Sequence, residues 1–294
     1  MNNRGLLCGL ACLGFLGFAP LAQAQESPTL SRIKKTNSVN VGVRDSSVPF
    51  SFLDENKQPI GYSVDLCIRI VDSIRSELKL PKLQVNFVTV SSSSRIPAVK
   101  EGKIDLECGS TTNTRARQQD VAFAYTTFVA GIKMVAKKSA KIRGIEDLSG
   151  KTVVLTNGTT AEGIINTANT ERRLGIQVVK SPDHAQSFQA VETDRAVAFV
   201  MDDVLLYGLI ARAKTPNDFE VVGKYLSIEP YGIMMQKSDP GFERLVNNAL
   251  VNMFNNGQAK QIYDKWFNSK YMKVPMSQNL REAFHMPNTH PAWP

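Results

Sequence analysis

Strand-like and helix-like segments alternate along most of the chain, and this alternation limits the fold more than any other feature of the sequence. Strand-like apolar runs lie at residues 39–44, 84–90, 104–107, 132–138, 152–156, 177–179, 196–201 and 231–236. Helix-like apolar spacing lies at residues 62–76, 96–101, 161–168, 184–193, 203–213, 240–255 and 258–268. Such alternation predicts an α/β protein with open sheets, in which ligands bind beyond the carboxyl ends of the strands.

The alternation restarts near Gly131, although no long linker separates the two halves. We therefore expect two lobes, each an open mixed sheet flanked by helices, with a ligand in the cleft between them. Lobe one comprises residues 25–130 and 226–294, lobe two comprises residues 131–225, and short crossovers join them. The tail from Ser269 is rich in Pro, Asn and Met, and we expect it to be an extended wrap.

Residues 1–24 resemble a cleavable secretory signal. Arg4 precedes an apolar stretch, and Ala22-Gln23-Ala24 is a small-x-small cleavage site. The apolar stretch is too short and too rich in glycine for a membrane span, and no cysteine follows it for lipid attachment. An exported protein without a lipid anchor needs an outer membrane to retain it, so the sequence predicts the periplasm.

The formal net charge of +8 is compatible with nucleic acid, an acidic membrane or acidic small ligands as partners. The Lys and Arg residues are scattered, with no dense basic run. Together with export, this scatter argues against nucleic acid as a partner.

Short motifs along the chain resemble the bacterial extracellular solute-binding proteins of family 3, which have the type II periplasmic binding fold. The general signatures are residues 49–52 (PFSF), 61–66 (GYSVDL), 145–153 (IEDLSGKTV) and 158–160 (GTT). Four further segments resemble the glutamate/aspartate-binding subfamily: residues 94–97 (SRIP), 107–113 (ECGSTTN), 183–184 (DH) and 201–203 (MDD). The resemblance covers roughly residues 30–270 and implies capture of L-glutamate or L-aspartate for the permease subunits of an ABC transporter, without catalysis.

Arg95 is expected to bind the α-carboxylate of such a ligand. It follows the strand at 84–90 and so lies at the carboxyl edge of the lobe-one sheet. A guanidinium can hold a carboxylate through two parallel hydrogen bonds. Between a strand and a helix of lobe two, Thr160 and the turn before it offer free backbone N–H groups. The alternatives are a solvated surface arginine and an ordinary helix start.

Acceptors for the ligand's ammonium group are expected from both lobes. Asp202 follows the buried strand at 196–201, and Asp203 is the better cap for the next helix, which leaves Asp202 free. Ser110 and Thr112 follow the strand at 104–107 and add carbonyl and hydroxyl oxygens, unless they are only turn residues.

The ligand's side chain is expected to meet Arg44 and His184. Similar proteins that bind basic or neutral amino acids often carry aspartate at the Arg44 position, and reversing this charge should reverse ligand preference. The resemblance places His184 at the same carboxylate, although a lone histidine is more often a cap or core residue. If its proton holds that carboxylate, binding weakens as pH rises. Ser92 adds a hydroxyl donor, and Phe50 either covers the ligand's methylenes or belongs to the core.

Cys67 and Cys108 are expected to form a disulfide. Cys67 lies on the apolar face of the helix at 62–76, and Cys108 ends a nearby strand of the same lobe. Paired thiols usually oxidise in an exported protein, although two buried free thiols are the alternative.

Other classes of function find less support. The sequence contains no Gly-x-Ser-x-Gly, His-Glu-x-x-His or phosphate-loop motif, so we expect no catalysis, cofactor or metal. The rival is a dehydratase-like enzyme on the same fold, with Glu107 and Glu162 as candidate acids. A receptor-coupled sensor of acidic amino acids is a third class. The protein is expected to be monomeric, and one methylene gives little basis for choosing between aspartate and glutamate.

The first prediction concerns processing. Protein purified from the periplasm should begin at Gln25, because the small-x-small site ends at Ala24. Intact mass spectrometry measures this, and a mass for all 294 residues or for a diacylglyceryl adduct would contradict it.

Overall fold

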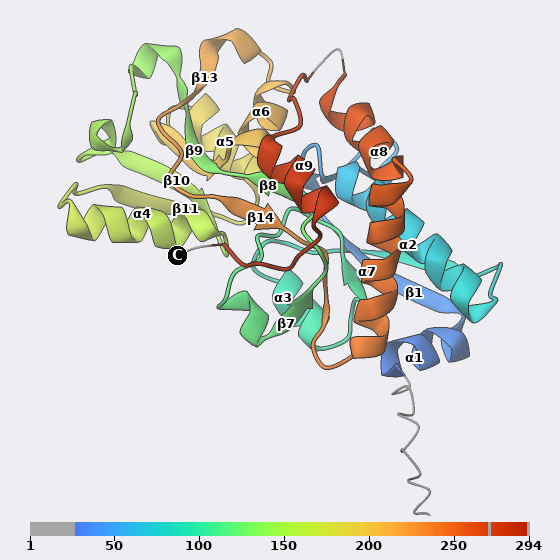
Figure 1. The fold of residues 1–294 in the computed structure, drawn as a ribbon. Helices are drawn as coiled ribbons and strands as arrows, with labels where there is room; N and C mark the ends of the chain where they lie inside the picture. Colours follow the sequence, from blue (N-terminus) through green and yellow to red (C-terminus); the bar gives the residue numbers. More distant parts are fainter. Residues whose placement is uncertain (1–26, 270–271, 293–294) are drawn as a thin grey trace, which may run out of the picture.

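The computed structural model describes residues 27–269 and 272–292, and the expected signal segment lies outside these residues. Two five-stranded sheets form two lobes, with helices packed around each sheet (Figure 1). A small three-stranded sheet consists of β2 (Ser46–Ser47), β3 (Ser51–Leu53) and β4 (Pro59–Ile60). Short 3₁₀ helices are η1 (Arg117–Gln119), η2 (Lys138–Ala140), η3 (Ile145–Leu148) and η4 (Pro216–Asp218).

Lobe one contains the sheet with strand order β5-β1-β6-β15-β7. Its strands are β5 (Gln84–Thr89), β1 (Ser38–Val43), β6 (Leu106–Glu107), β15 (Met234–Gln236) and β7 (Val121–Phe123). β1 runs parallel to β5 and β6, whereas β15 is antiparallel to β6 and β7. Its helices are α1 (Pro28–Thr36), α2 (Tyr62–Leu78), α3 (Arg95–Lys100), α7 (Pro240–Asn255), α8 (Gln258–Phe267) and α9 (Gln278–His285).

Lobe two contains the sheet with strand order β11-β10-β12-β9-β13. Its strands are β11 (Gln177–Ser181), β10 (Thr152–Thr156), β12 (Ala198–Asp202), β9 (Ile132–Lys137) and β13 (Phe219–Val222). β10 is parallel to β11 and β12, and β9 is antiparallel to β12 and β13. Its helices are α4 (Thr160–Glu171), α5 (His184–Glu192) and α6 (Asp203–Ile210). The expected α/β fold with two mixed sheets is therefore confirmed.

Two strands connect the lobes. β8 (Phe128–Ala130) leads into lobe two, β14 (Glu229–Tyr231) returns from it, and the two pair antiparallel. We call this pair the hinge ribbon. The lobe boundaries that we set after residues 130 and 225 stay predictions.

Several elements were absent from the sequence prediction. The tail predicted to be wholly extended contains α9, which begins at Ser277 as an N-cap that accepts a hydrogen bond from Leu280 N (3.2 Å). Helix α9 is only eight residues long and buries Leu280 and Ala283, so its helical pattern is short and easily overlooked in a tail rich in Pro, Asn and Met. Likewise, α1 buries only two of its nine residues, and β7, β8 and β13 are only three or four residues long. Such short patterns are too weak to be read from one sequence.

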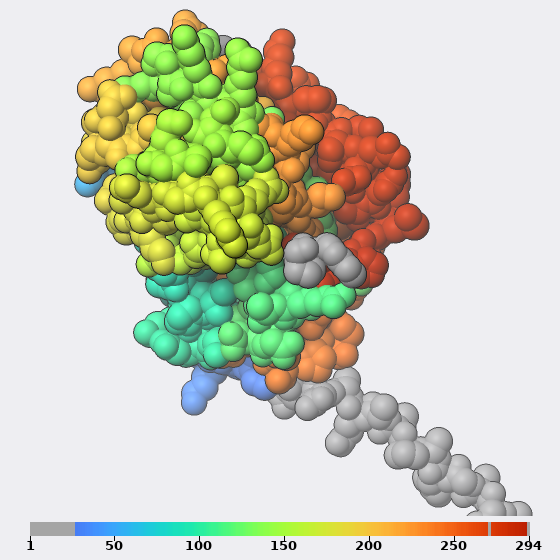
Figure 2. Space-filling model, turned by 90° about the vertical axis from the view of Figure 1, so that its left-hand side faces the viewer, coloured from blue at the N-terminus to red at the C-terminus, as the bar shows by residue number. Residues whose placement is uncertain are grey.

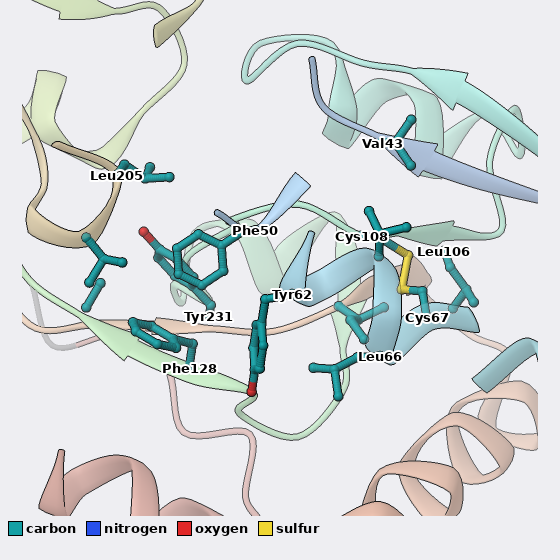
Figure 3. Packing of buried hydrophobic residues seen from close by; sticks show 14 of the residues in the cluster. Val43, Phe50, Tyr62, Leu66, Cys67, Leu106, Cys108, Phe128, Leu205 and Tyr231 are labelled. Carbon is teal, nitrogen blue, oxygen red and sulfur yellow. A yellow bond between two sulfur atoms is a disulfide. The ribbon is translucent and has the colours of Figure 1, made fainter. Parts of the chain in front are cut away.

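Aromatic rings anchor the hinge ribbon to the core of lobe one (Figure 3). Phe50 lies at their centre, with ring-centroid distances of 4.8 Å to Phe128 and 5.1 Å to Tyr231 in edge-on contacts. Phe50 is 0% exposed and also packs on Tyr62 and Phe267. Of the two roles considered for Phe50, the structure therefore shows the core role.

The disulfide between Cys67 and Cys108 is present, as predicted (Figure 3). It joins α2 to the segment that follows β6, with a Cα–Cα distance of 6.3 Å and a sequence separation of 41. Cys108 stands just before the loop that begins at Gly109, so the bond fixes the start of that loop.

The second prediction concerns this bond. Replacing both cysteines by alanine should lower the free energy of unfolding by about 3–4 kcal/mol, because a closed loop of this length restricts the unfolded chain. Urea unfolding of the oxidised protein and of the double variant measures the difference. Two free thiols in denatured, unreduced protein would contradict the prediction.

Candidate functional site

A small, tightly closed polar cavity lies between the lobes. It is found at the carboxyl ends of strands from both sheets, where the alternating pattern predicted a ligand. Seven of the eight predicted site residues line it, and three residues outside that prediction complete the wall. The lining residues are Ser92, Arg95, Ser110, Thr112, Arg117, Thr159, Thr160, His184, Met201 and Asp202.

The two lobes are in contact around this cavity. A Cβ atom added to Gly158, which has φ +77° in the turn before α4, would come within 2.8 Å of Ser93 Cα. A Cβ atom added to Gly208 on α6 would come within 2.4 Å of the Val48 carbonyl oxygen. In Figure 2 the yellow-green surface around α4 lies directly on the teal and green surface of lobe one. The structure is therefore a closed form of the two lobes.

Arg44 is the exception among the predicted site residues, because it does not line the cavity. It is 0% exposed, and its Nη2 donates to Ser92 Oγ (2.9 Å), which does line the cavity. Its Nε and Nη1 have no hydrogen-bond partner among the residues that the structure describes. Burial and then the neighbouring Arg95 lower the pKa of Arg44 to about 10. At neutral pH Arg44 is a buried cation with unused donors.

Arg95 begins α3 and is also buried. Its Nη1 donates to Thr111 Oγ1 (2.6 Å) and to the Ser110 carbonyl oxygen (3.3 Å), and Thr111 Oγ1 donates to Glu107 Oε2 (2.7 Å). Its Nε has no partner within the described part of the chain. Burial lowers the pKa of Arg95, and Glu107 opposes that shift. The negative charge of Glu107 thus compensates the positive charge of Arg95, to which Thr111 links it, and this compensation accounts for the burial of Glu107.

Arg117 is a cavity residue that the sequence reasoning missed. Its Nη1 donates to the Thr112 carbonyl oxygen (2.8 Å) and its Nη2 to the Gly158 carbonyl oxygen of lobe two (3.1 Å). Burial lowers its pKa to about 10. Arg117 lies seven residues beyond Ser110 in a polar stretch, and such a stretch is typical of solvated surface. The sequence signal that could have identified it is its position shortly after the loop at the carboxyl end of a strand.

His184 begins α5, and Asp183 caps that helix by accepting from Gln186 N (2.8 Å). The imidazole Nδ1 lies 2.9 Å from Thr156 Oγ1, and the ring lines the cavity. Burial lowers the pKa of His184 well below its ordinary value, and the positive charges of Arg44 and Arg95 lower it further. These effects favour the neutral ring at pH 7, and the role of His184 at the ligand's carboxylate stays a prediction.

Asp202 makes no side-chain cap bond, as the sequence reasoning expected. It occupies the N-cap position of α6, and its Oδ1 has no partner among the described residues. Asp203 is the first residue of α6, and its Oδ1 accepts from Val204 N (2.8 Å) at the start of that helix. Its Oδ1 also accepts from Gly131 N (3.3 Å), and its Oδ2 accepts from the Tyr225 hydroxyl (2.8 Å). Asp203 therefore ties together the segments beside the hinge ribbon.

Smaller polar residues from both lobes also line the cavity. Ser110 Oγ has no partner in the described residues, and the Thr112 backbone pairs with Tyr231 of β14. Thr160 is the first residue of α4 and lines the cavity, and its Oγ1 donates to Glu229 Oε2 (2.8 Å), so its hydroxyl is already bonded.

Metal and membrane features were also sought. No group of three or more His, Cys, Asp or Glu residues within the described ranges is placed to hold a metal ion. In the same residues, no helix combines the length and apolar character needed to cross a bilayer.

The fold and the cavity define a class: two α/β lobes, joined by two strands, that close on one small polar ligand. Residues 39–269 match the sequence pattern of the bacterial extracellular solute-binding proteins, family 3. The chain belongs to this family.

Two relatives are similar over nearly the whole chain. The L-glutamate/L-aspartate-binding protein of Pseudomonas aeruginosa is 41% identical over 288 residues, which cover 96% of this chain and 95% of the relative. The glutamate/aspartate import solute-binding protein of Salmonella typhimurium is 40% identical, with 98% of each chain covered.

Solved structures show the same fold. A mutant of the arginine-binding protein from T. maritima has a TM-score of 0.74 at 28% identity, covering 82% of this chain and 100% of that one. An ancestral amino-acid-binding protein, a precursor of cyclohexadienyl dehydratase, has a TM-score of 0.68 at 31% identity, covering 81% and 99%.

The third prediction concerns protons at Asp202. Burial raises the pKa of Asp202 well above its ordinary value, and Glu229 raises it further. A ligand ammonium beside Asp202 should lower that pKa, because it favours the carboxylate. Binding should therefore release protons below the raised pKa, and affinity should increase with pH until Asp202 is ionised in the free protein.

Calorimetry in buffers of different ionisation enthalpy measures the proton count. Asp202→Asn should abolish the release and weaken binding. Net proton uptake on binding, which protonation of His184 would produce, is the contrary result.

Proposed function

We propose that this protein is the periplasmic binding component of an ABC uptake system for L-glutamate and L-aspartate. The observation that carries the proposal is the Arg44 guanidinium, which is fully buried with Nε and Nη1 unbonded among the described residues. A buried cation is stable only when it is paired. Arg95 lowers the pKa of Arg44, whereas Glu107, Asp45 and Asp183 raise it. None of these carboxylates hydrogen-bonds to its Nε or Nη1, so an anionic ligand held next to Ser92 is the partner that we propose for this charge.

The two ends of the cavity suit the two ends of an acidic amino acid. The charges of Arg44 and Arg95 both lower the pKa of His184, and this proximity supports our proposal that the three groups bind the ligand's side-chain carboxylate. Ser92 adds a hydroxyl, since it accepts from Arg44 and has its own proton to donate.

The α-amino and α-carboxylate groups fit the other end. Arg117 bonds to backbone on both lobes beside the N-terminus of α4, where free N–H groups favour an anion. We therefore propose Arg117, with the backbone of Thr160, for the α-carboxylate, in place of the α-carboxylate role that the sequence suggested for Arg95. Asp202 is the partner of the ammonium group, assisted by Ser110 and Thr112.

Closure follows from this division of contacts. Arg44, Arg95 and Arg117 belong to lobe one, whereas Thr160, His184 and Asp202 belong to lobe two. Neither lobe alone satisfies every charge of the ligand, so binding favours the closed arrangement over an open one. A permease then receives the ligand from the closed protein, and the hinge ribbon is where the lobes separate.

The nearest rival function is a dehydratase-like enzyme, since one structural relative is a precursor of such an enzyme. The candidate acids do not support it. Glu107 accepts from Thr111, which bridges it to Arg95, and Glu162 forms an ion pair with Lys180 on the outer side of α4. The ligand should therefore be recovered unchanged. The family name places its members outside the cell membrane, and the periplasm itself is part of our proposal.

The fourth prediction separates the three arginines by ligand type. Arg44→Ala should weaken glutamate and aspartate binding by about 2–5 kcal/mol, because the side-chain carboxylate loses a desolvated partner. Arg44→Ala and Arg95→Ala should both reduce the preference in binding affinity for glutamate over glutamine. Arg117→Ala should weaken glutamate and glutamine alike, because both carry an α-carboxylate.

Calorimetry with glutamate, aspartate and their amides measures these constants. Lys133→Ala, which removes a half-buried lysine that lies over the Tyr225 ring outside the cavity, is the control and should change little. If the wild type binds glutamine as tightly as glutamate, Arg44 does not set specificity and the proposed substrate is wrong.

A further inference from the structure

The last described segment of the chain lies beyond the match to the family, which ends at residue 269. Residues 286–292, here called the C-terminal strap, run from α9 toward α4 (Figure 1). The strap contacts the loop of residues 110–118, here called the ligand loop, which carries three of the cavity residues. The Thr289 carbonyl oxygen accepts from Asn113 Nδ2 (3.0 Å) and from Gln118 Nε2 (3.1 Å).

Asn113 is the junction between the strap and the ligand loop. The Ala292 N–H donates to the Asn113 carbonyl oxygen (2.7 Å), and the Asn113 N–H donates to the Pro230 carbonyl oxygen of β14 (2.7 Å). Asn113 Oδ1 also accepts from Gln118 Nε2 (2.9 Å). Asn113 is 1% exposed and does not line the cavity. Its backbone and side chain thus fasten the ligand loop to the hinge ribbon on one side and to the strap on the other.

The strap also holds the segment that leads into β8. The Asn288 carbonyl oxygen accepts from Thr126 N (3.0 Å) and from Thr126 Oγ1 (3.3 Å). The same short segment therefore bonds to the ligand loop and to the chain just before the hinge ribbon.

We propose that the C-terminal strap is a positioning element of the binding site, which acts through Asn113 to hold Thr112 and Arg117 ready for the ligand. Arg117 bonds to the Thr112 carbonyl oxygen within the ligand loop and to Gly158 across the cleft, so its placement affects both binding and closure. A loop that is already ordered loses less entropy when the ligand binds. This inference rests on the proposed function for the identity of the ligand.

Removal of the strap is feasible because α9 has its own anchors. Leu280 and Ala283 are buried, and Phe284 stacks on Phe254 of α7 at a ring-centroid distance of 4.3 Å. A chain that ends at Met286 therefore keeps these anchors of α9 and loses the strap's hydrogen bonds to the ligand loop and to Thr126.

The test compares the wild type and one control variant with four altered proteins, in glutamate affinity and in unliganded melting temperature. They are a chain ending at Met286, a chain ending at Ala292, Asn113→Ala, and the combination of Asn113→Ala with the shorter chain. If strap removal lowers the binding-ready fraction of the loop to about a tenth, the affinity falls about tenfold. Asn113→Ala should weaken binding by a smaller factor, because Gln118 Nε2 still donates to the Thr289 carbonyl oxygen and Ala292 N–H still donates to the backbone of residue 113. The combination should bind about as weakly as the shorter chain, because that chain already lacks the strap.

Asn86→Ala is the matched control, since Asn86 Nδ2 also donates one 3.0 Å hydrogen bond, to Asn40 Oδ1, and lies in β5. It and the chain ending at Ala292 should bind as the wild type does. An unliganded melting temperature that falls while affinity stays within about twofold of wild type would overturn the proposal, because only a structural role would remain.

Two further outcomes are distinguished. If the shorter chain does not fold, Asn113→Ala decides alone, and unchanged affinity in that variant overturns the proposal. If the wild type binds neither glutamate nor aspartate, the proposed function fails, and the same variants are then measured with whichever common amino acid the wild type binds.

Discussion

The cleft depends on a single physical constraint, which is the burial of positive charge without a complete set of protein partners. Arg44 and Arg95 are almost fully buried, and each keeps at least one N–H group unbonded among the described residues. Removing a guanidinium from water is costly unless hydrogen bonds and opposite charge replace its hydration. Glu107 balances Arg95 through Thr111, but the network leaves donors unused. The closed form therefore has buried N–H groups that an anion can pair with, and the anionic ligand that we propose would stabilise closure in this way.

The hinge ribbon, which consists of the two strands that join the lobes, is connected to the ligand-binding residues. Tyr231 of β14 packs on Phe50 and Phe128 in the core of lobe one, and its neighbouring backbone pairs with Thr112 of the ligand loop. On the lobe-two side, Asp203 bonds to the segments at both ends of the ribbon. Ligand contacts and hinge strands thus share one hydrogen-bonded layer. Because Thr112 pairs directly with Tyr231, any movement of β14 would act on the ligand loop.

Sequence reasoning succeeded where residues signal their position locally. Seven predicted site residues line one cavity because each follows a strand or opens a helix, and such points in open α/β sheets gather at one edge. It failed where the signal is non-local. Arg117 is a binding-site candidate only because Gly158 of the other lobe lies across the cleft from it. Helix α9 escaped prediction because its packing on α7, not its own periodicity, holds it in place.

The sequence by itself determined the α/β class, the two-sheet organisation, the disulfide partners and most of the polar residues of the cavity, because strand and helix periodicity and turn residues are properties of short segments. Only the tertiary structure decided which charges meet. It placed Arg44 behind Ser92 and set His184 beside two arginines that keep its ring neutral. It also laid the C-terminal strap against Asn113. These outcomes depend on burial and on distances between segments far apart in the chain. Neither quantity can be predicted from a short stretch of sequence.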